Sequence, residues 1–317
     1  MSDPSSAVVP SPDPSSSAAA PLPGGAIQRI GIVARPSSRE AVRTASEVAD
    51  WLRRRGRDVA LHETILRSRG IDARAPERCR AAGFEVFSLD GIYDLVVALG
   101  GDGTLLSVAR ALSHELPILG VNLGNLGFLT EVPRTELYPS LVRVLDKDFI
   151  IERRSLLDVE LRRPGKETRK LRAFNDAVVA KDALAHIISL AVRVGGRLIA
   201  RMRCDGAIVS SPNGSTAYNL SAGGPIVYPE LPVIVLTPIC PHTLSMRSVV
   251  VPDHEPLEIT LETQGESVFL TVDGQEGNPL AARDTIWIRR AAAQVQLVRV
   301  TGQSFYDSLR EKLHWGD

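Results

Sequence analysis

The first half of the chain alternates between two kinds of apolar segment. Leu95 to Leu99 is an unbroken apolar run rich in β-branched residues, which is typical of a buried strand. From Leu105 to Leu112, apolar residues recur every three or four positions, as they do on one face of a helix. Because strand and helix patterns alternate, we predict a Rossmann-like α/β domain with a parallel sheet. Further strands are expected at 27–33, 58–61, 84–87 and 117–121, and a helix from Ser37 or Ser38 to Gly56.

The pattern changes near residue 146. Apolar and polar residues then alternate with a period of two, and turn residues separate the segments. This is typical of antiparallel strands with one buried face, so we predict a β-rich second domain. Phe305, Leu309 and Leu313 return to helical spacing, and we expect this C-terminal segment to pack back on the first domain. Strands of the second domain are expected at 156–161, 173–180, 187–194, 198–204, 233–236, 257–261, 268–272, 285–288 and 295–300.

These patterns divide the chain into three parts. Residues 1–26 are rich in Ser, Pro and Ala, which predicts a disordered tail. The tail has no basic residues, so it does not fit a secretory or transit peptide. Residues 27–145, together with about 301–317, form the predicted α/β domain, and residues 146–300 form the β-rich domain.

Composition excludes several classes of protein. Lys plus Arg and Asp plus Glu both number 37 in 317 residues, so no basic surface for a nucleic acid is expected. No apolar run is long enough to cross a membrane. Cys79, Cys204 and Cys240 are too scattered for a disulfide framework or a zinc site. Together these features predict a cytoplasmic protein.

The turn between the predicted strand at 95–99 and the helix at 105–112 carries the first candidate chemistry. Gly100-Gly-Asp-Gly-Thr104 presents backbone N–H groups and a helix N-terminus, which suit a phosphate group. The turn is neither a Walker A loop nor a GxGxxG motif. A carboxylate beside phosphates is repelled unless a metal bridges them or the carboxylate accepts a proton from a substrate hydroxyl. The alternative is a structural turn in which Asp102 or Thr104 caps the helix.

Three loops in the second half are unusual for hairpins. Residues 205–225 combine hydroxyls, small side chains and one aromatic ring, Tyr218. Such a loop suits hydrogen bonds to phosphate or ribose and stacking on a base. Residues 237–245 and 272–275 have a similar character. Taken singly, each loop is more simply explained as a structural turn marked by Pro or Gly.

Together, these stretches resemble the bacterial NAD kinase family. The resemblance covers essentially everything after the N-terminal tail. Gly-Gly-Asp-Gly alone is shared with diacylglycerol, sphingosine and phosphofructokinase-type enzymes, whereas the set of five motifs in this order is specific. The five motifs are Gly100–Thr104, Asn122–Thr130, Asn175–Asp176, Ser215–Pro225 and Thr237–Ser245.

The resemblance implies transfer of the terminal phosphoryl group of ATP to the 2′-hydroxyl of the adenosine ribose of NAD, giving NADP and ADP. It also implies a site in the cleft between the two domains, with the β-rich domain binding the dinucleotide. Mg²⁺ is expected to be carried with ATP, without a dedicated protein metal site. Polyphosphate or another nucleoside triphosphate is an alternative donor. The family usually assembles as a homodimer or homotetramer.

The resemblance also assigns roles to individual residues. Asp102 is the implied proton acceptor, and a magnesium ligand is its alternative role. Phe128 is expected on the nicotinamide side. Phosphate contacts are implied for Gly100, Gly101, Gly103 and Thr104. NAD contacts are implied for Asp102, Gly103, Asn175, Asp176, His186, Arg203, Asp205, Thr216, Ala217, Tyr218, Asn219, Leu220, Ser221 and Gln275.

The chain departs from the family pattern at a few positions. Asp176 is one methylene shorter than the commoner Glu, Asn213 replaces a Thr, and Asn125 stands where relatives often have Arg or His. Two rival hypotheses stay open. A lipid kinase is disfavoured by the neutral charge and the polar 205–225 loop. A non-enzymatic pyridine-nucleotide sensor is disfavoured by the presence of Asp102.

Overall fold

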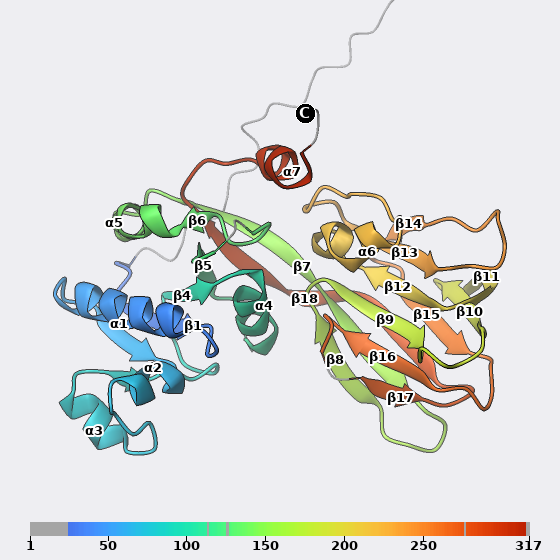
Figure 1. Ribbon diagram of the computed structural model, residues 1–317, viewed down its shortest axis with the longest axis horizontal. Coiled ribbons are helices and arrows are strands. Elements are labelled where there is room, and N and C mark those ends of the chain that lie inside the picture. Colours follow the sequence, from blue (N-terminus) through green and yellow to red (C-terminus); the bar gives the residue numbers. More distant parts are fainter. Residues whose placement is uncertain (1–24, 113, 125–126, 276, 315–317) are drawn as a thin grey trace, which may run out of the picture.

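The protein is described by a computed structural model over residues 25–112, 114–124, 127–275 and 277–314. Its strands form one sheet of twelve strands and one of six within these residues. The first half of the chain lies on the left of Figure 1 and the second half on the right, and the larger sheet runs through both. The predicted N-terminal tail lies almost entirely outside the described residues.

The first half builds the parallel part of the large sheet, in the order β3-β2-β1-β4-β5-β6. Both faces of this part are covered. Leu95, Val97 and Leu99 of β4 pack in one buried cluster with α1, whereas Val96 and Ala98 pack in another with α4. The bounds are β1 (Arg29–Ala34), β2 (Asp58–Leu61), β3 (Glu85–Val86), β4 (Leu95–Gly100), β5 (Pro117–Asn122), β6 (Val132–Pro133), α1 (Arg39–Arg53) and α4 (Asp102–Ala111).

Helix α1 forms as its spacing predicts. Ser38, rather than Ser37, is the N-cap, and its hydroxyl accepts a hydrogen bond from the Ala41 N–H at 3.2 Å. The chain leaves the helix through Gly56, whose φ of 73° is in the left-handed region that glycine tolerates. Four further helical segments of this half were not predicted, since three are only one or two turns long. They are α2 (Glu63–Ser68), α3 (Pro76–Ala81), η1 (Arg134–Glu136) and α5 (Leu137–Leu145).

The second half is a sandwich of two antiparallel layers. The six-stranded sheet has the order β14-β13-β12-β9-β16-β17, and all its pairs are antiparallel. A buried cluster joins its inner face to strands of the large sheet, as is usual in sandwiches. The strands of this sheet are β9 (Asp176–Lys181), β12 (Gly206–Ser210), β13 (Val233–Ile239), β14 (Val249–Pro252), β16 (Val268–Val272) and β17 (Asn278–Leu280).

The remaining strands extend the large sheet into the second half. They are β7 (Ile150–Arg162), β8 (Arg169–Ala173), β10 (Ile188–Val194), β11 (Arg197–Cys204), β15 (Leu257–Leu261) and β18 (Thr285–Arg299). The segments expected at 285–288 and 295–300 are one strand, β18, with a register shift between Arg290 and Gln294. One end of β18 pairs antiparallel with β15, and the other pairs in parallel with β5 through Gln296 and Leu297. The two halves therefore share one continuous sheet.

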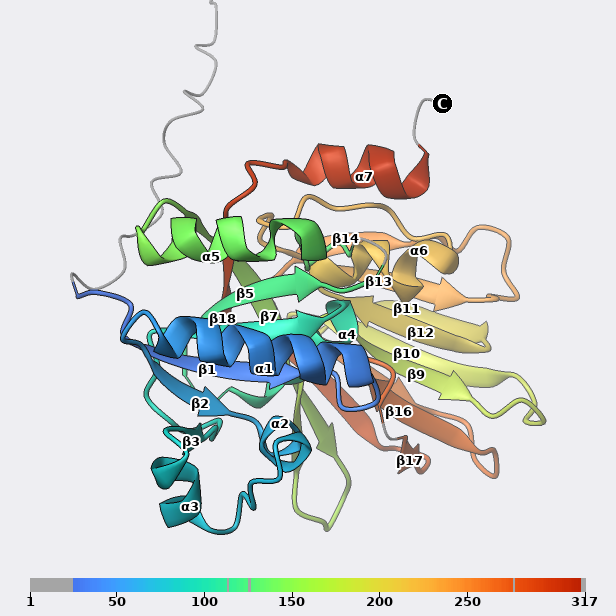
Figure 2. The same ribbon diagram turned by 60° about the vertical axis from the view of Figure 1, so that its left-hand side comes forward.

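The C-terminal helix α7 (Phe305–Leu313) has the predicted apolar spacing. Ser304 begins it with a capping box, in which its hydroxyl accepts from the Asp307 N–H while the Asp307 carboxylate accepts from the Ser304 N–H. The Lys312 ammonium lies 4.8 Å from the centre of the Phe128 ring, in the first half of the chain. Figure 2 shows α7 lying along the top of the molecule, above α5 and α6 (Tyr218–Ser221).

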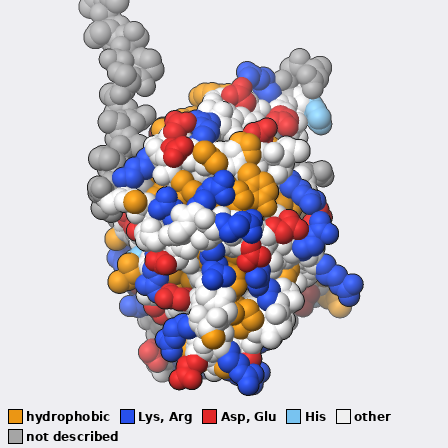
Figure 3. Space-filling view, turned by 90° about the vertical axis from the view of Figure 1, so that its left-hand side faces the viewer, with side chains coloured by type: hydrophobic (Ala, Val, Ile, Leu, Met, Phe, Trp, Pro, Cys, Tyr) orange, Lys and Arg blue, Asp and Glu red, His pale blue; other side chains and the backbone are white. Residues whose placement is uncertain are grey.

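Acidic and basic side chains are mixed on one face of the protein. Figure 3 shows the face seen from the left of Figure 1, where Lys and Arg side chains alternate with Asp and Glu. This mixture matches the equal numbers of acidic and basic residues in the sequence. No helix of the described residues is long and apolar enough to cross a membrane.

Candidate active site

The glycine turn places the start of α4 directly at the end of β4. Gly101 is the N-cap of α4 and supplies no side chain to satisfy the first N–H groups of the helix. These groups, with the positive end of the helix dipole, are available to an anion. Among the described residues, a Cβ at Gly101 or Gly103 would meet no atom within 4 Å, so no described atom covers this end of the helix. The structural alternative, in which Asp102 or Thr104 caps the helix, is not what the turn adopts.

The Asp102 carboxylate is held by the loop that follows β5. Its Oδ2 accepts a hydrogen bond from the Phe128 N–H at 2.8 Å. Its Oδ1 accepts from the Leu129 N–H at 3.2 Å, the Thr130 N–H at 3.0 Å and the Thr130 hydroxyl at 2.9 Å. Gly127 permits this approach, because a Cβ there would overlap Oδ1. The carboxylate is therefore fixed in one orientation.

The two carboxylate oxygens differ in what they can still accept. Each oxygen of an ionised carboxylate has two lone pairs. Within the described residues, Oδ1 already has three donors, whereas Oδ2 has one, the Phe128 N–H. Oδ2 of Asp102 is thus the atom with room for one more hydrogen bond, such as one from a substrate hydroxyl.

The Asn175–Asp176 pair faces α4 from the second half of the chain. Phe174, immediately before the pair, is fully buried in one cluster with Leu105 and Val108 of α4. Asp176 is only 4% exposed. Burial first, and the Asp273 carboxylate second, raise the pKa of Asp176 to about 7. Asp176 therefore changes its charge near neutral pH.

The loop at 213–221 lies against the Asn175–Asp176 segment, because Gly214 packs on the Asn175 carbonyl. Its residues differ in how far they are buried. The Asn219 side chain is fully buried, donates to the carbonyls of Ser215 and Pro225, and accepts from the Thr237 hydroxyl at 2.7 Å. These hydrogen bonds hold the loop together. Tyr218 is 47% exposed, which leaves its ring free to stack. Thr216, Ala217 and Leu220 are half-buried and Ser221 is exposed.

A series of buried charged side chains connects the loop at 213–221 to the loop that holds Asp102. Arg299 donates to the Leu129 carbonyl at 3.2 Å and to the Glu152 carboxylate. The other oxygen of Glu152 lies 2.6 Å from Nη2 of Arg154, and Arg154 Nη1 donates to Asn213 Oδ1 at 3.1 Å. Burial lowers the pKa of the Arg154 guanidinium to about 10, although Glu152 opposes this. The sequence patterns did not reveal this connection.

Asp205 lies at the opposite end of β9 from Asp176. Its carboxylate is 3.7 Å from Nζ of Lys181, the last residue of β9, whereas Asp176 is the first. Five residues of a strand span roughly 17 Å. The structure therefore separates Asp205 from Asp176 within one copy of the chain.

His186 and Arg203 belong to this distant region. The His186 ring is 89% exposed, and its Nδ1 lies 3.1 Å from the Glu266 carboxylate. Arg203 is on β11, the edge strand of the large sheet, where it pairs with Ser189 of β10. Gln275 is exposed in the turn after β16. It lies two residues after Asp273, whose N–H donates to the Asp176 carbonyl. Asn125, one of the departures in sequence, lies outside the described residues.

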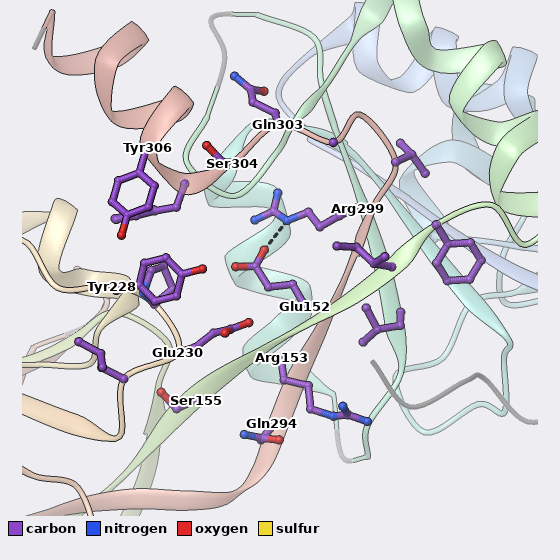
Figure 4. A pocket seen from close by; sticks show the side chains of 18 of the residues that line it. Glu152, Arg153, Ser155, Tyr228, Glu230, Gln294, Arg299, Gln303, Ser304 and Tyr306 are labelled. Carbon is purple, nitrogen blue, oxygen red and sulfur yellow. Dashed lines mark hydrogen bonds and ion pairs between the residues drawn. The ribbon is translucent and has the colours of Figure 1, made fainter. Parts of the chain in front are cut away.

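A cavity of about 1300 Å³ lies elsewhere among the described residues. It lies beneath the start of α7, and Figure 4 shows Tyr228 and Tyr306 on one wall with the Glu152–Arg299 ion pair on another. None of the residues that line it belongs to the Asp102 turn or the Asn175–Asp176 pair. We place the candidate site by its chemistry rather than by cavity size.

Comparison with known proteins decides the family. Residues 30–149 match the model of the ATP-NAD kinase N-terminal domain, and residues 174–300 match that of the ATP-NAD kinase C-terminal domain. The chain belongs to the NAD kinase family. The NAD kinase of Syntrophotalea carbinolica is 42% identical over 292 residues, covering 92% of this chain and 100% of the relative. That of Geotalea daltonii is 42% identical over 297 residues, with the same coverage. The predicted family and enzyme class are confirmed.

Two solved structures share the fold. Yeast NADH kinase in complex with NADH gives a TM-score of 0.81 at 24% identity, covering 93% of this chain and 89% of that one. An NAD kinase from Archaeoglobus fulgidus in complex with ATP gives a TM-score of 0.68 at 25% identity, covering 90% and 99%. The predicted combination of an α/β part, a β-rich part and a returning C-terminal segment is therefore confirmed.

Several residues of this NAD kinase family member gain importance only from the structure. Thr130 gives Asp102 two of its four hydrogen bonds, and its hydroxyl also accepts from the Asn122 amide at 3.0 Å. Asp273 accepts hydrogen bonds from the backbone of the Asn175–Asp176 segment. Each lies inside a stretch that the sequence singled out, but the partners are far apart along the chain.

Proposed function

We propose that the chain transfers the terminal phosphoryl group of ATP to the 2′-hydroxyl of the adenosine ribose of NAD, giving NADP and ADP. The observation that carries this proposal is the Asp102 carboxylate, which is fixed at an open helix N-terminus with one free acceptor position on Oδ2. A hydroxyl that donates to Oδ2 would lie beside N–H groups suited to phosphate.

In this reaction the ribose 2′-oxygen forms a bond to the γ-phosphorus, and the bond from that phosphorus to the bridging oxygen breaks. ADP leaves with the bonding electrons, and the 2′-hydroxyl proton passes to Asp102 Oδ2. Phosphoryl transfer depends mainly on in-line positioning and charge stabilisation. The N-terminal amides of α4, near Gly101 and Gly103, supply the positive end of a dipole for the phosphates.

Mg²⁺ is the proposed metal, carried by the nucleotide. Among the described residues, no three His, Cys, Asp or Glu side chains gather into a metal-binding cluster. One carboxylate, Asp102, faces the phosphate position, and Mg²⁺ typically takes one or two carboxylates with substrate phosphates and water. The residues present therefore fit a metal held mainly by ATP, where it would neutralise phosphate charge.

In this proposal the two domains bind different substrates. Residues 27–145, with the segment after residue 300, would present Asp102 and the donor phosphates. Residues 146–300 would bind the dinucleotide through Asn175, Asp176 and the loop with Tyr218. The Arg299–Leu129 hydrogen bond, and the buried cluster that Phe174 shares with Leu105 and Val108 of α4, support a site shared by the two.

Self-association gives the distant residues a role. His186, Arg203 and Asp205 are implied as NAD contacts but lie at the far end of the β-rich half. The neighbouring edge strands carry exposed apolar side chains, with Leu198 of β11 45% exposed and Val250 of β14 48% exposed. We propose a homodimer or homotetramer in which these residues complete the site of a second copy. A monomer with full activity would contradict this assembly.

The three cysteines fit a reducing compartment. Cys79 and Cys204 are buried free thiols, and Cys240 is an exposed one. Burial raises the pKa of the Cys204 thiol to about 11, so packing rather than reactivity is its proposed role. The cytoplasm is the proposed location of the enzyme.

The test is NADP formation from NAD, ATP and Mg²⁺, read with an NADP-specific dehydrogenase. Asp102→Asn keeps the shape of the side chain and removes its charge, so we expect kcat to fall by about 10²- to 10⁴-fold. Asp94→Asn is the matched control, because Asp94 also accepts backbone N–H groups, from Gln28 at 2.7 Å and Arg29 at 2.8 Å. The control variant should retain kcat.

Binding measurements separate the rival hypotheses. Calorimetry with NAD should give the same affinity for Asp102→Asn as for the unchanged chain, within a few-fold. NAD binding without NADP formation from ATP, polyphosphate or other triphosphates would favour a sensor. Phosphorylation of diacylglycerol in vesicles, without NADP formation, would favour a lipid kinase. An Asp102→Asn variant with nearly unchanged kcat would overturn the proton-acceptor role.

A further inference from the structure

Asp273 is a buried carboxylate whose hydrogen bonds all converge on one short segment. It lies in the turn between β16 and β17, and its side chain is 1% exposed. Its Oδ1 accepts from the Asn175 N–H at 2.7 Å and the Asp176 N–H at 3.0 Å, and its Oδ2 accepts from the Phe174 N–H at 2.9 Å. Three consecutive backbone amides therefore point at one carboxylate.

The opposite side of the same segment is held equally closely. The Asn175 carbonyl accepts from the Ser211 N–H at 2.8 Å. Gly214 packs against that carbonyl so tightly that a Cβ there would lie 2.6 Å from the Asn175 carbonyl carbon. The Asp273 N–H also donates to the Asp176 carbonyl at 2.9 Å. The backbone at Asn175–Asp176 is thus fixed from both sides, which directs the two side chains.

Asp273 adopts a backbone conformation that favours glycine. Its φ is 48°, in the left-handed region, which is unfavourable for most non-glycine residues. Glycine would adopt this turn more easily but would carry no carboxylate to accept the three amide hydrogen bonds.

The other partner of Asp273 comes from helix α4. Arg110 Nε lies 3.6 Å from Asp273 Oδ2. This nitrogen is buried and makes no hydrogen bond to another described residue, so Asp273 is its counter-charge. Arg110 is eight residues after Asp102 on the same helix, which corresponds to roughly 12 Å along the axis. One carboxylate thus contacts both the Asn175–Asp176 segment and the helix that begins at Asp102.

We propose that Asp273 is a positioning residue, which orients Asn175 and Asp176 toward the dinucleotide and ties them through Arg110 to the helix that carries Asp102. This inference rests on the proposed function. It assigns to Asp273 a role separate from that of Gln275, the residue of the same turn expected to contact NAD. Asp273 itself does not need to touch the substrate.

The test compares three variants by KM, kcat and calorimetric NAD affinity. Asp273→Ala removes the acceptor for all three amides and should raise the KM for NAD about 10-fold or more. Asp273→Asn keeps one oxygen and should show a smaller increase. The KM for ATP should change less than about 3-fold in both, because the phosphate turn keeps its own hydrogen bonds.

The matched control is Asp284→Asn. Asp284 has a fully buried side chain, accepts from the Ala281 N–H at 2.8 Å and pairs with Arg163 at 2.6 Å, but contacts none of the site residues. It reproduces the burial, charge and turn position of Asp273. We expect Asp284→Asn to lower the melting temperature and to leave the KM for NAD unchanged.

Two results would overturn the inference. One is an Asp273→Ala variant that is folded and keeps the KM and NAD affinity of the unchanged chain. The other is an Asp284→Asn variant that raises the KM for NAD as much as Asp273→Asn does, which would reveal a general effect of stability. If Asp273→Ala does not fold, the KM for NAD and the NAD affinity are compared in Asp273→Asn and Arg110→Met instead. Arg110→Met leaves Asp273 and its turn unchanged. Failure of the proposed function is distinguishable, because the unchanged chain would then form no NADP whatever Asp273 does to NAD binding.

Discussion

A single methyl group at Gly127 should displace the carboxylate of Asp102, the proposed proton acceptor, without removing any functional group. A Cβ at this position would overlap Asp102 Oδ1 and the Thr130 hydroxyl, and would lie 2.5 Å from Asp102 Cγ. Ordinary contact begins at 3.4 Å, so the carboxylate or the loop must move by at least about 0.9 Å to clear Cγ, and by more to clear Oδ1. We therefore predict that Gly127→Ala disables the enzyme by geometry alone.

The magnitude follows from the cost of misplacement. A displacement of about 1 Å in a reacting group lowers the rate by about 10²-fold, which corresponds to about 2.7 kcal/mol of activation free energy. The movement also disturbs the four hydrogen bonds that fix Asp102, two of which come from Thr130. We expect kcat for NADP formation to fall by about 100-fold, and the KM for NAD to change only a few-fold.

Gly124→Ala is the control in the same loop. Among the described residues, a Cβ at Gly124 would approach nothing closer than Asn122 Oδ1, at 3.9 Å, which is ordinary contact. The control should keep kcat within about 3-fold of the unchanged chain. Circular dichroism and the melting temperature check that both variants are folded. A folded Gly127→Ala enzyme with nearly full kcat would refute the idea that the 127–130 loop fixes the reactive geometry of Asp102.

Two further substitutions test the buried polar groups. The pKa of Asp176 is raised from 3.8 to about 7, so the folded state binds its proton more tightly than the unfolded state does. The free energy of unfolding should therefore decrease by up to about 4 kcal/mol as the pH rises from 3.8 to 7, of which about 2.7 kcal/mol falls between pH 5 and 7. Asp176→Asn should remove the decrease that urea titrations measure between pH 5 and 8. Asn213→Ala leaves Arg154 Nη1 and the Ser155 carbonyl without their partner, so we expect a loss of about 1–3 kcal/mol in urea-induced unfolding. If the free energy of unfolding of the unchanged chain did not vary with pH, the raised pKa of Asp176 would be contradicted. An Asn213→Ala variant as stable as the unchanged chain would contradict the role of the Asn213 hydrogen bonds.

Local features of the fold were predictable because adjacent residues encode them. The apolar run before Gly100 and the helical spacing after it gave the strand, the turn and the helix in the right order. The helix begins at Asp102 rather than Leu105, because polar and glycine residues of a first turn carry no apolar periodicity. Strand β18 was divided into two because Ala291-Ala-Ala interrupts the alternation, whereas the structure absorbs these residues in a register shift.

The partners of the key residues were not predictable, because they are distant in sequence. Asp102 is held by residues 26 to 28 positions later, and Asp273 binds amides 97 to 99 positions earlier. The motifs marked both loops as unusual but carried no information on which carboxylate faces which amide. For the same reason, family resemblance implied His186 and Asp205 as contacts without revealing that they lie far from Asp102 in one copy.

The site is held together by polar contacts that cross between the two halves of the chain at two separate places. On one side, Arg299 and Arg154 connect the loop of Leu129 to Asn213 through Glu152; on the other, Arg110 meets Asp273. Both are largely desolvated, so breaking either leaves an uncompensated buried charge, which is more costly than losing an exposed ion pair. These contacts start from the Asp102 loop and the Asp102 helix and end at Asn213 and Asp273, so they hold the two parts of the candidate site to one another. We therefore expect these charges to contribute to the geometry of the candidate site as well as to stability.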